Sequence, residues 1–246
     1  MTRTLGGEDG MIPLRARFIA RRHRELVGKP LRSRRVGAGP LLPLFLAGIV
    51  VLIWLMLVLS PGESPALTIG FTFFMALLML GIYLFTIDAR LVVCERGILL
   101  GRLVPGLPFS PTYVIGGREI DPRTVAVVTD GAKTARELGM PFFFFQYKTF
   151  PGALGVHAVV FNGPWGADIE APRQPRHRGP VRKSLFLFSH RSATKIAEEI
   201  LHAIGRFGAI PPGFAPHEGL RPIPVTGRRE DAVAQIPGAW PPDGHR

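Results

Sequence analysis

The sequence predicts a membrane α-helical hairpin followed by an α+β, mostly β domain that ends in one C-terminal amphipathic helix. Three observations predict this arrangement. Two long apolar runs carry no ionisable side chain, the segment after residue 88 changes to short β-branched runs separated by turn residues, and one strongly periodic helical segment follows over 192–207. The chain of 246 residues has room for both parts, with tails at either end.

The hairpin is predicted from runs 41–59 and 67–87, which contain no Asp, Glu, Lys, Arg or His. Roughly 20 apolar residues rising about 1.5 Å each match a hydrocarbon core of about 30 Å. A run in lipid must satisfy its backbone internally, which favours helices. Since ion pathways and proton relays need ionisable groups at membrane depth, we expect an anchor.

The orientation of this hairpin follows from the charges that flank it. Residues 1–40 form a basic N-terminal tail, whereas the loop between the two runs carries only Glu63. The positive-inside rule places such a tail in the cytoplasm, and two crossings return the chain there. The sequence therefore predicts a two-pass inner-membrane protein with cytoplasmic N- and C-termini.

Segment 12–27 of the tail shows helical spacing. Apolar residues recur every three or four positions from Ile12 to Val27, and arginines cover the rest of the wheel. One interpretation is a basic amphipathic helix on a headgroup surface. The alternative is an unstructured basic tail that only sets topology. In the first case the candidate binding residues are Arg15, Arg17, Arg21, Arg22 and Arg24.

A β-rich domain is predicted over 88–208. Its expected strands are β-branched or aromatic runs bounded by Gly, Pro or Asp. Ser192 is a suitable N-cap for the last helix, whose apolar stripe runs from Ile196 to Phe207. Residues 209–246 are rich in Pro and Gly and are expected to be disordered. The predicted strands are 91–94, 98–100, 124–129, 142–147, 156–161 and 185–188, with a short helix at 132–138.

A basic loop within 171–183 is the second candidate binding surface. Clustered cations could hold anionic headgroups or an acidic or phosphorylated partner. The alternative is a solvated loop, broken by prolines, that charge keeps soluble. Its candidate residues are Arg173, Arg176, Arg178, Arg182 and Lys183.

Signatures of catalysis and of metal binding are missing from the sequence. It contains no H-E-x-x-H, no P-loop, no G-x-S-x-G and no G-x-G-x-x-G between a strand and a helix. Cys94 is the only cysteine, so an internal disulfide and a multi-cysteine metal site are excluded. Its place in a predicted strand favours an inert, buried thiol. We expect no enzyme activity, no cofactor and no metal.

The order of strands and a final helix resembles pleckstrin-homology-like (PH-like) domains of the bacterial kind that follows a transmembrane hairpin. Segment 91–100 resembles the first hairpin of such domains, and segment 189–197 resembles their passage from last strand to capping helix. The resemblance implies a binding module without catalytic residues. In its lipid-binding members the ligand lies at the first hairpin loop, which here offers Arg96 and Arg102.

The sequence therefore predicts a membrane-anchored, non-enzymatic binding or scaffold protein of the cytoplasmic face. Expected partners are the bilayer, anionic lipid headgroups, a protein partner or a second copy of the chain. The alternative is a non-catalytic subunit of a membrane enzyme or transport complex. A net charge of +12 also admits nucleic acid, but no recognisable module supports that partner. The abundance of Arg, Ala, Gly and Pro is typical of an actinobacterial, GC-rich genome.

Overall fold

The chain forms two compact units in the computed structural model. One unit comprises residues 38–88, and the other combines residues 1–37 with 89–246. We refer to them as the hairpin unit and the body. The structure describes residues 11–36, 41–59, 65–87, 89–102, 112–139, 149–150, 152–164, 183–206, 210, 213–214, 220–227 and 229–237.

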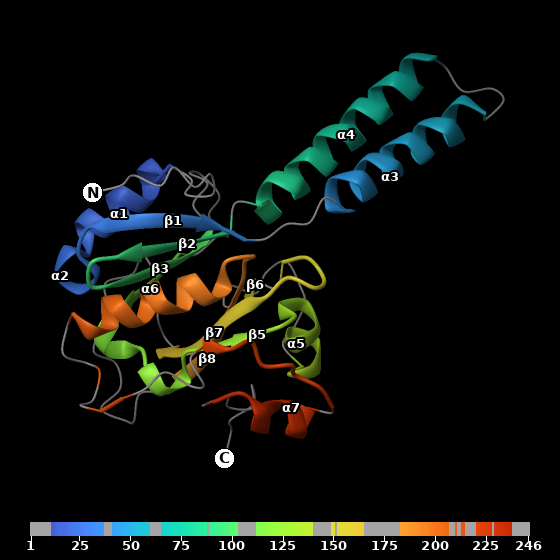
Figure 1. Ribbon diagram of the computed structural model, residues 1–246. Helices are drawn as coiled ribbons and strands as arrows, with labels where there is room; N and C mark the ends of the chain where they lie inside the picture. The colour runs from blue at the N-terminus through green and yellow to red at the C-terminus, as the bar shows by residue number, and fades with distance from the viewer. Residues whose placement is uncertain are drawn as a thin grey trace, which may run out of the picture. The chain divides into compact units, whose positions relative to one another are not determined.

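The first sheet of the body is antiparallel and has the order β1-β2-β3-β4 (Figure 1). Arg35 of β1 lies opposite Arg90 of β2, so the whole hairpin unit is an insertion between two neighbouring strands. The strands are β1 (Pro30–Arg35), β2 (Ala89–Cys94), β3 (Gly97–Arg102) and β4 (Thr112–Gly116).

The second sheet of the body is mixed and has the order β5-β7-β8-β6. Strands β7 and β8 pair along their full length in antiparallel register, while β6 adds to β8 in parallel. Its strands are β5 (Ala126–Val128), β6 (Thr149–Phe150), β7 (Ala158–Pro164) and β8 (Lys183–Ser189).

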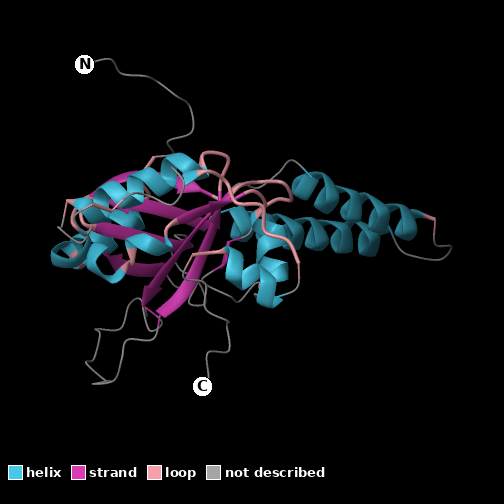
Figure 2. Ribbon diagram, turned by 60° about the horizontal axis from the view of Figure 1, so that its bottom comes forward, coloured by secondary structure: helices cyan, strands magenta, loops and turns pink. Residues whose placement is uncertain are grey.

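Helices cover the faces of both sheets, as Figures 1 and 2 show. Helices α1 and α2 lie on one face of the first sheet, and α6 lies between the two sheets. Helices α5 and α7 lie on the far face of the second sheet. The body's helices are α1 (Leu14–Arg22), α2 (Arg24–Val27), α5 (Gly131–Glu137), α6 (Ala193–Gly205) and α7 (Arg229–Gln235), with 3-10 turns at Gly117–Glu119 and Pro122–Thr124.

The main core lies between the two sheets. Strand side chains alternate between faces, so every second residue of each strand points toward the other sheet. Leu91 and Val93 of β2 point into the core with Ile196 and Ile200 of α6, whereas Val92 and Cys94 point to the α1 side. The sheets also touch directly. Phe186 of β8 meets Tyr113 of β4 edge to face, with ring centroids 5.4 Å apart. Such burial on both faces explains the nearly unbroken apolar character of β2.

The hairpin unit consists of α3 (Leu41–Val58) and α4 (Pro65–Ile87), which pack side by side (Figure 1). Both helices form at the predicted runs. Large apolar side chains are nevertheless exposed on them, among them Leu44, Met56, Phe73 and Phe74.

The prediction that these helices cross a membrane is corrected by the structure. Among the residues that the structure describes, no helix is long and apolar enough for a span. The two-pass inner-membrane localisation depended on the spans and is corrected with them.

The PH-like fold prediction is also wrong. The body is an α/β arrangement of two four-stranded sheets rather than one strand-rich segment closed by a final helix. Its first sheet takes an edge strand, β1, from the segment before the hairpin unit, and its second contains a parallel pair. Sequence reading missed β1 because Arg32, Arg34 and Arg35 interrupt any alternating apolar pattern.

Several expected local elements are present at their predicted positions. The turn between β2 and β3, the strands near 126, 158 and 185, and the helix from Ala193 all form. The C-terminal segment, where no regular structure was expected, contributes α7 and pairs Ile223 with Val128 of β5. The predicted strand at 142–147 lies outside the described residues.

Candidate functional site

One concavity of the body is a strongly charged groove of about 640 Å³, which we call the basic groove. Four arginines line it beside two glutamates and one histidine. It lies where the end of α1, the turn into α2 and the β2–β3 turn meet. The lining residues are Arg21, Arg22, His23, Arg24, Glu25, Leu26, Gly28, Glu95 and Arg96.

Backbone hydrogen bonds hold the two walls of the basic groove together. The amide of Arg96 donates to the carbonyl of Val27 at 2.8 Å, and the amide of Glu95 donates to the carbonyl of Lys29 at 2.9 Å. In return, the Lys29 amide donates to Oε2 of Glu95 at 3.1 Å. The β2–β3 turn is therefore fixed against the end of α2, and the groove is preformed.

Gly28 makes this close approach possible. Its φ of +74° lies in a region that side-chain-bearing residues rarely adopt. A Cβ on Gly28 would come within 2.9 Å of Cβ of Glu95 and 3.0 Å of Cγ of Arg96. Val27, immediately before Gly28, is fully buried and packs against the first sheet.

The arginines of the basic groove are exposed, although the segment that carries them is anchored. Arg21, Arg22, Arg24 and Arg96 all lie at the surface. Guanidinium groups form paired hydrogen bonds with phosphate and carboxylate oxygens and stay charged at every physiological pH. Four of them around one concavity, against two carboxylates, give its lining a net positive charge.

The predicted N-terminal arginines divide into two groups. Arg21, Arg22 and Arg24 converge in the basic groove, whereas Arg15 is half-buried and Arg17 is exposed earlier on α1. Helix α1 itself forms, but its predicted apolar face, with Ala16, Ile19 and Ala20, packs on the first sheet. That face therefore cannot rest on headgroups.

The second predicted surface falls mainly outside the described residues. Arg173, Arg176, Arg178 and Arg182 are all in this category. Lys183 is the first residue of β8, where its backbone pairs with Pro164 of β7. The structure thus neither joins this loop to the basic groove nor separates the two.

Sequence reasoning missed the partner wall of the basic groove. Arg96 was noted only for the turn between β2 and β3, and nothing in the sequence joined it to arginines near residue 22. Strand β1 brings the two walls together, because its pairing with β2 places the end of α2 beside the β2–β3 turn. Glu95, whose carboxylate caps the Lys29 amide, follows from the same pairing.

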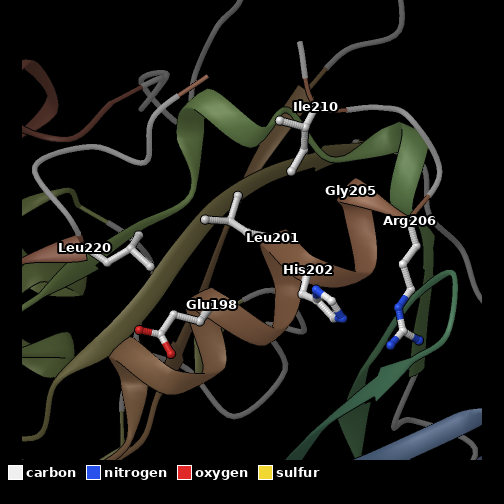
Figure 3. A pocket seen from close by; sticks show the side chains of 7 residues that line it. All are labelled: Glu198, Leu201, His202, Gly205, Arg206, Ile210 and Leu220. Carbon is white, nitrogen blue, oxygen red and sulfur yellow. The ribbon is translucent and has the colours of Figure 1, made fainter. Parts of the chain in front are cut away.

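A second concavity of about 520 Å³ lies along α6 (Figure 3). Its apolar floor consists of Leu201, Ile210 and Leu220. Glu198, His202 and Arg206 follow one another at four-residue spacing along the helix. Glu198 and Arg206 carry opposite charges, so this rim offers no net preference for an anion. The basic groove is the stronger candidate.

Chemistry beyond binding finds little support in the described part of the chain. Burial, with a smaller contribution from the Glu95 carboxylate, raises the pKa of the Cys94 thiol to about 12. A protonated, buried thiol is not a nucleophile at neutral pH. Within the described ranges, no group of three His, Cys, Asp or Glu side chains is placed to hold a metal ion.

No protein-family model, curated protein or solved structure matches this chain. The assignment of a function therefore depends on the geometry of the basic groove alone.

Proposed function

We propose that this protein is a non-enzymatic binding module that holds a phosphate- or carboxylate-bearing group in its basic groove. One observation carries the proposal: Arg21, Arg22 and Arg24 converge with Arg96, which is distant in sequence, around one concavity. Glu25 and Glu95 offset part of the mutual repulsion among these guanidinium groups, and a bound anion would offset more of it. The preformed backbone lowers the ordering cost of binding.

Phosphate oxygens fit this site better than a single carboxylate. Several guanidinium groups can contact one phosphate or diphosphate, and each charge-assisted hydrogen bond is roughly twice as strong as a neutral one. Glu25 and Glu95 restrict where the anion can lie, because it must keep away from their carboxylates. The groove therefore favours a compact anion close to the arginine wall.

The test uses inorganic pyrophosphate as the probe and the full chain as the receptor. Isothermal titration calorimetry on the unaltered chain should show binding that weakens as salt is added. Arg22→Glu, a surface change, should weaken the affinity by about tenfold or more, since it removes one charged contact and adds a repulsive one.

Arg136→Glu is the matched control. Arg136 is exposed on α5, on the far face of the second sheet. Its replacement by Glu changes the net charge of the chain by the same amount as Arg22→Glu does. It should leave the pyrophosphate affinity within about twofold of the unaltered chain. The proposal fails if the unaltered chain does not bind pyrophosphate, or if the two variants weaken it equally.

A further inference from the structure

The outward face of α1 and the segment just before it carry an apolar stripe that no described part of the body covers. Met11, Leu14 and Phe18 have exposed fractions of 82%, 79% and 68%. Leu14 and Phe18 lie four residues apart on one side of α1, opposite the buried Ala16 and Ala20, and Met11 lies in the segment just before the helix. We call these three side chains the α1 stripe.

The α1 stripe leads directly into the basic groove. Arg21 and Arg22 lie three and four residues after Phe18, so they occupy the next turn of the same face. Both arginines also line the groove. One continuous surface therefore runs along α1, apolar at its beginning and cationic at its end.

This surface is held in place from beneath. The buried face of α1 packs in a cluster with Val92, Leu99 and Val114 of the first sheet. Ahead of the helix, Nη1 of Arg90 donates to the Met11 carbonyl at 3.4 Å. A binding partner would thus meet an ordered helix and would not have to order it.

We propose that the α1 stripe and the basic groove together bind one segment of a protein partner, an amphipathic helix with an apolar face and acidic or phosphorylated residues. This inference rests on the proposed anion site and adds the nature of its ligand. Charge complementarity supports an acidic segment, and the four-residue spacing of Leu14 and Phe18 matches the anchors by which one helix contacts another.

A protein segment explains the surface better than a lipid surface does. Glu25 and Glu95 line the groove beside the arginines. A sheet of lipid phosphates would bring negative charge against both glutamates, whereas a single segment can direct its acidic side chains to the arginines alone.

The test uses a fluorescein-labelled synthetic helix of about five turns, with leucines on one face and glutamates on the other. Fluorescence anisotropy with the full chain should show saturable binding. Phe18→Ser and Arg22→Glu should each weaken it by about tenfold or more. The matched controls Leu154→Ser, at a leucine 76% exposed elsewhere on the body, and Arg136→Glu should leave it unchanged.

Two further measurements distinguish the possible failures. Phe18→Ser should retain the pyrophosphate affinity of the unaltered chain, because the stripe does not contact the anion. Pyrophosphate binding without peptide binding, or peptide binding that Phe18→Ser does not weaken, overturns this inference alone. If the unaltered chain does not bind pyrophosphate, the proposed anion site is overturned as well. Co-sedimentation with phosphatidylglycerol vesicles, in the absence of peptide binding, would identify a lipid surface instead.

Discussion

Arg34 on β1 and Glu199 on α6 form an ion pair, with 3.2 Å between Nη2 and Oε1. The Arg34 side chain is only 4% exposed and that of Glu199 only 16%. Arg32 reaches the same oxygen from the surface, at 2.6 Å. The pair therefore ties the edge strand of the first sheet to the helix between the sheets.

We expect Glu199→Ala to lower the free energy of unfolding by about 2–4 kcal/mol, because it removes the acidic partner of a buried guanidinium. Arg32→Ala should lower it by at most about 1 kcal/mol, since that side chain is half exposed. Urea denaturation of the three proteins measures both values. Equal losses of unfolding free energy for Glu199→Ala and Arg32→Ala would show that the buried Arg34–Glu199 pair stabilises the fold no more than an exposed pair does.

Asp130 joins α5 to the loop before β7. Its Oδ1 accepts from the Lys133 amide at 2.9 Å as an N-cap, and its Oδ2 accepts from the Gly155 amide at 2.9 Å. Asp130→Ala removes both contacts, so we expect a loss of about 2–3 kcal/mol in urea denaturation. Asp130→Asn keeps one acceptor oxygen and should lose less. A larger loss for Asn than for Ala would contradict this account.

Local structure followed from the sequence wherever a local cause dominates. The start of α6 after Ser192 and the β2–β3 turn were both predicted. Turn chemistry and apolar periodicity act over a few residues, so they leave a readable pattern.

Tertiary structure did not follow, because its causes lie far apart in the chain. β1 is held by pairing with β2 and by the Arg34–Glu199 pair, and neither can be read within Pro30–Arg35. The apolar face of α1 was correctly identified but was assigned to headgroups rather than to the first sheet. Recognising the basic groove requires both β1 and the packing of α1 on the first sheet. Of its lining, Arg21, Arg22 and Arg24 were predicted as binding residues, and the opposite wall formed by the β2–β3 turn was not.

Cys94 should make stability depend on pH in the alkaline range. Burial raises the pKa of its thiol from an ordinary 9.0 to about 12 in the folded chain. Above pH 9.0 the unfolded chain releases this proton while the folded chain keeps it, so the unfolded state binds fewer protons and stability falls as pH rises.

The measurement compares the unaltered chain with Cys94→Ala between about pH 8 and about pH 10. The free energy of unfolding of the unaltered chain should fall more steeply, approaching an extra slope of about 1.4 kcal/mol per pH unit. Subtracting the variant removes the titration of lysines and tyrosines. Parallel curves would show that the thiol is not buried as described.

Gly28 links stability to the proposed function. At its φ of +74° an alanine is strained, and its Cβ would collide with Glu95 and Arg96. Gly28→Ala should therefore move the β2–β3 turn away from α2, destabilise the fold by about 1–3 kcal/mol and weaken pyrophosphate binding. Gly155 is a matched control, since it has a φ of +73° but no atom within 4 Å of an added Cβ. Gly155→Ala should carry the backbone strain alone and leave pyrophosphate affinity unchanged. If calorimetry shows equal affinity for both alanine variants, the close approach at Gly28 does not shape the basic groove.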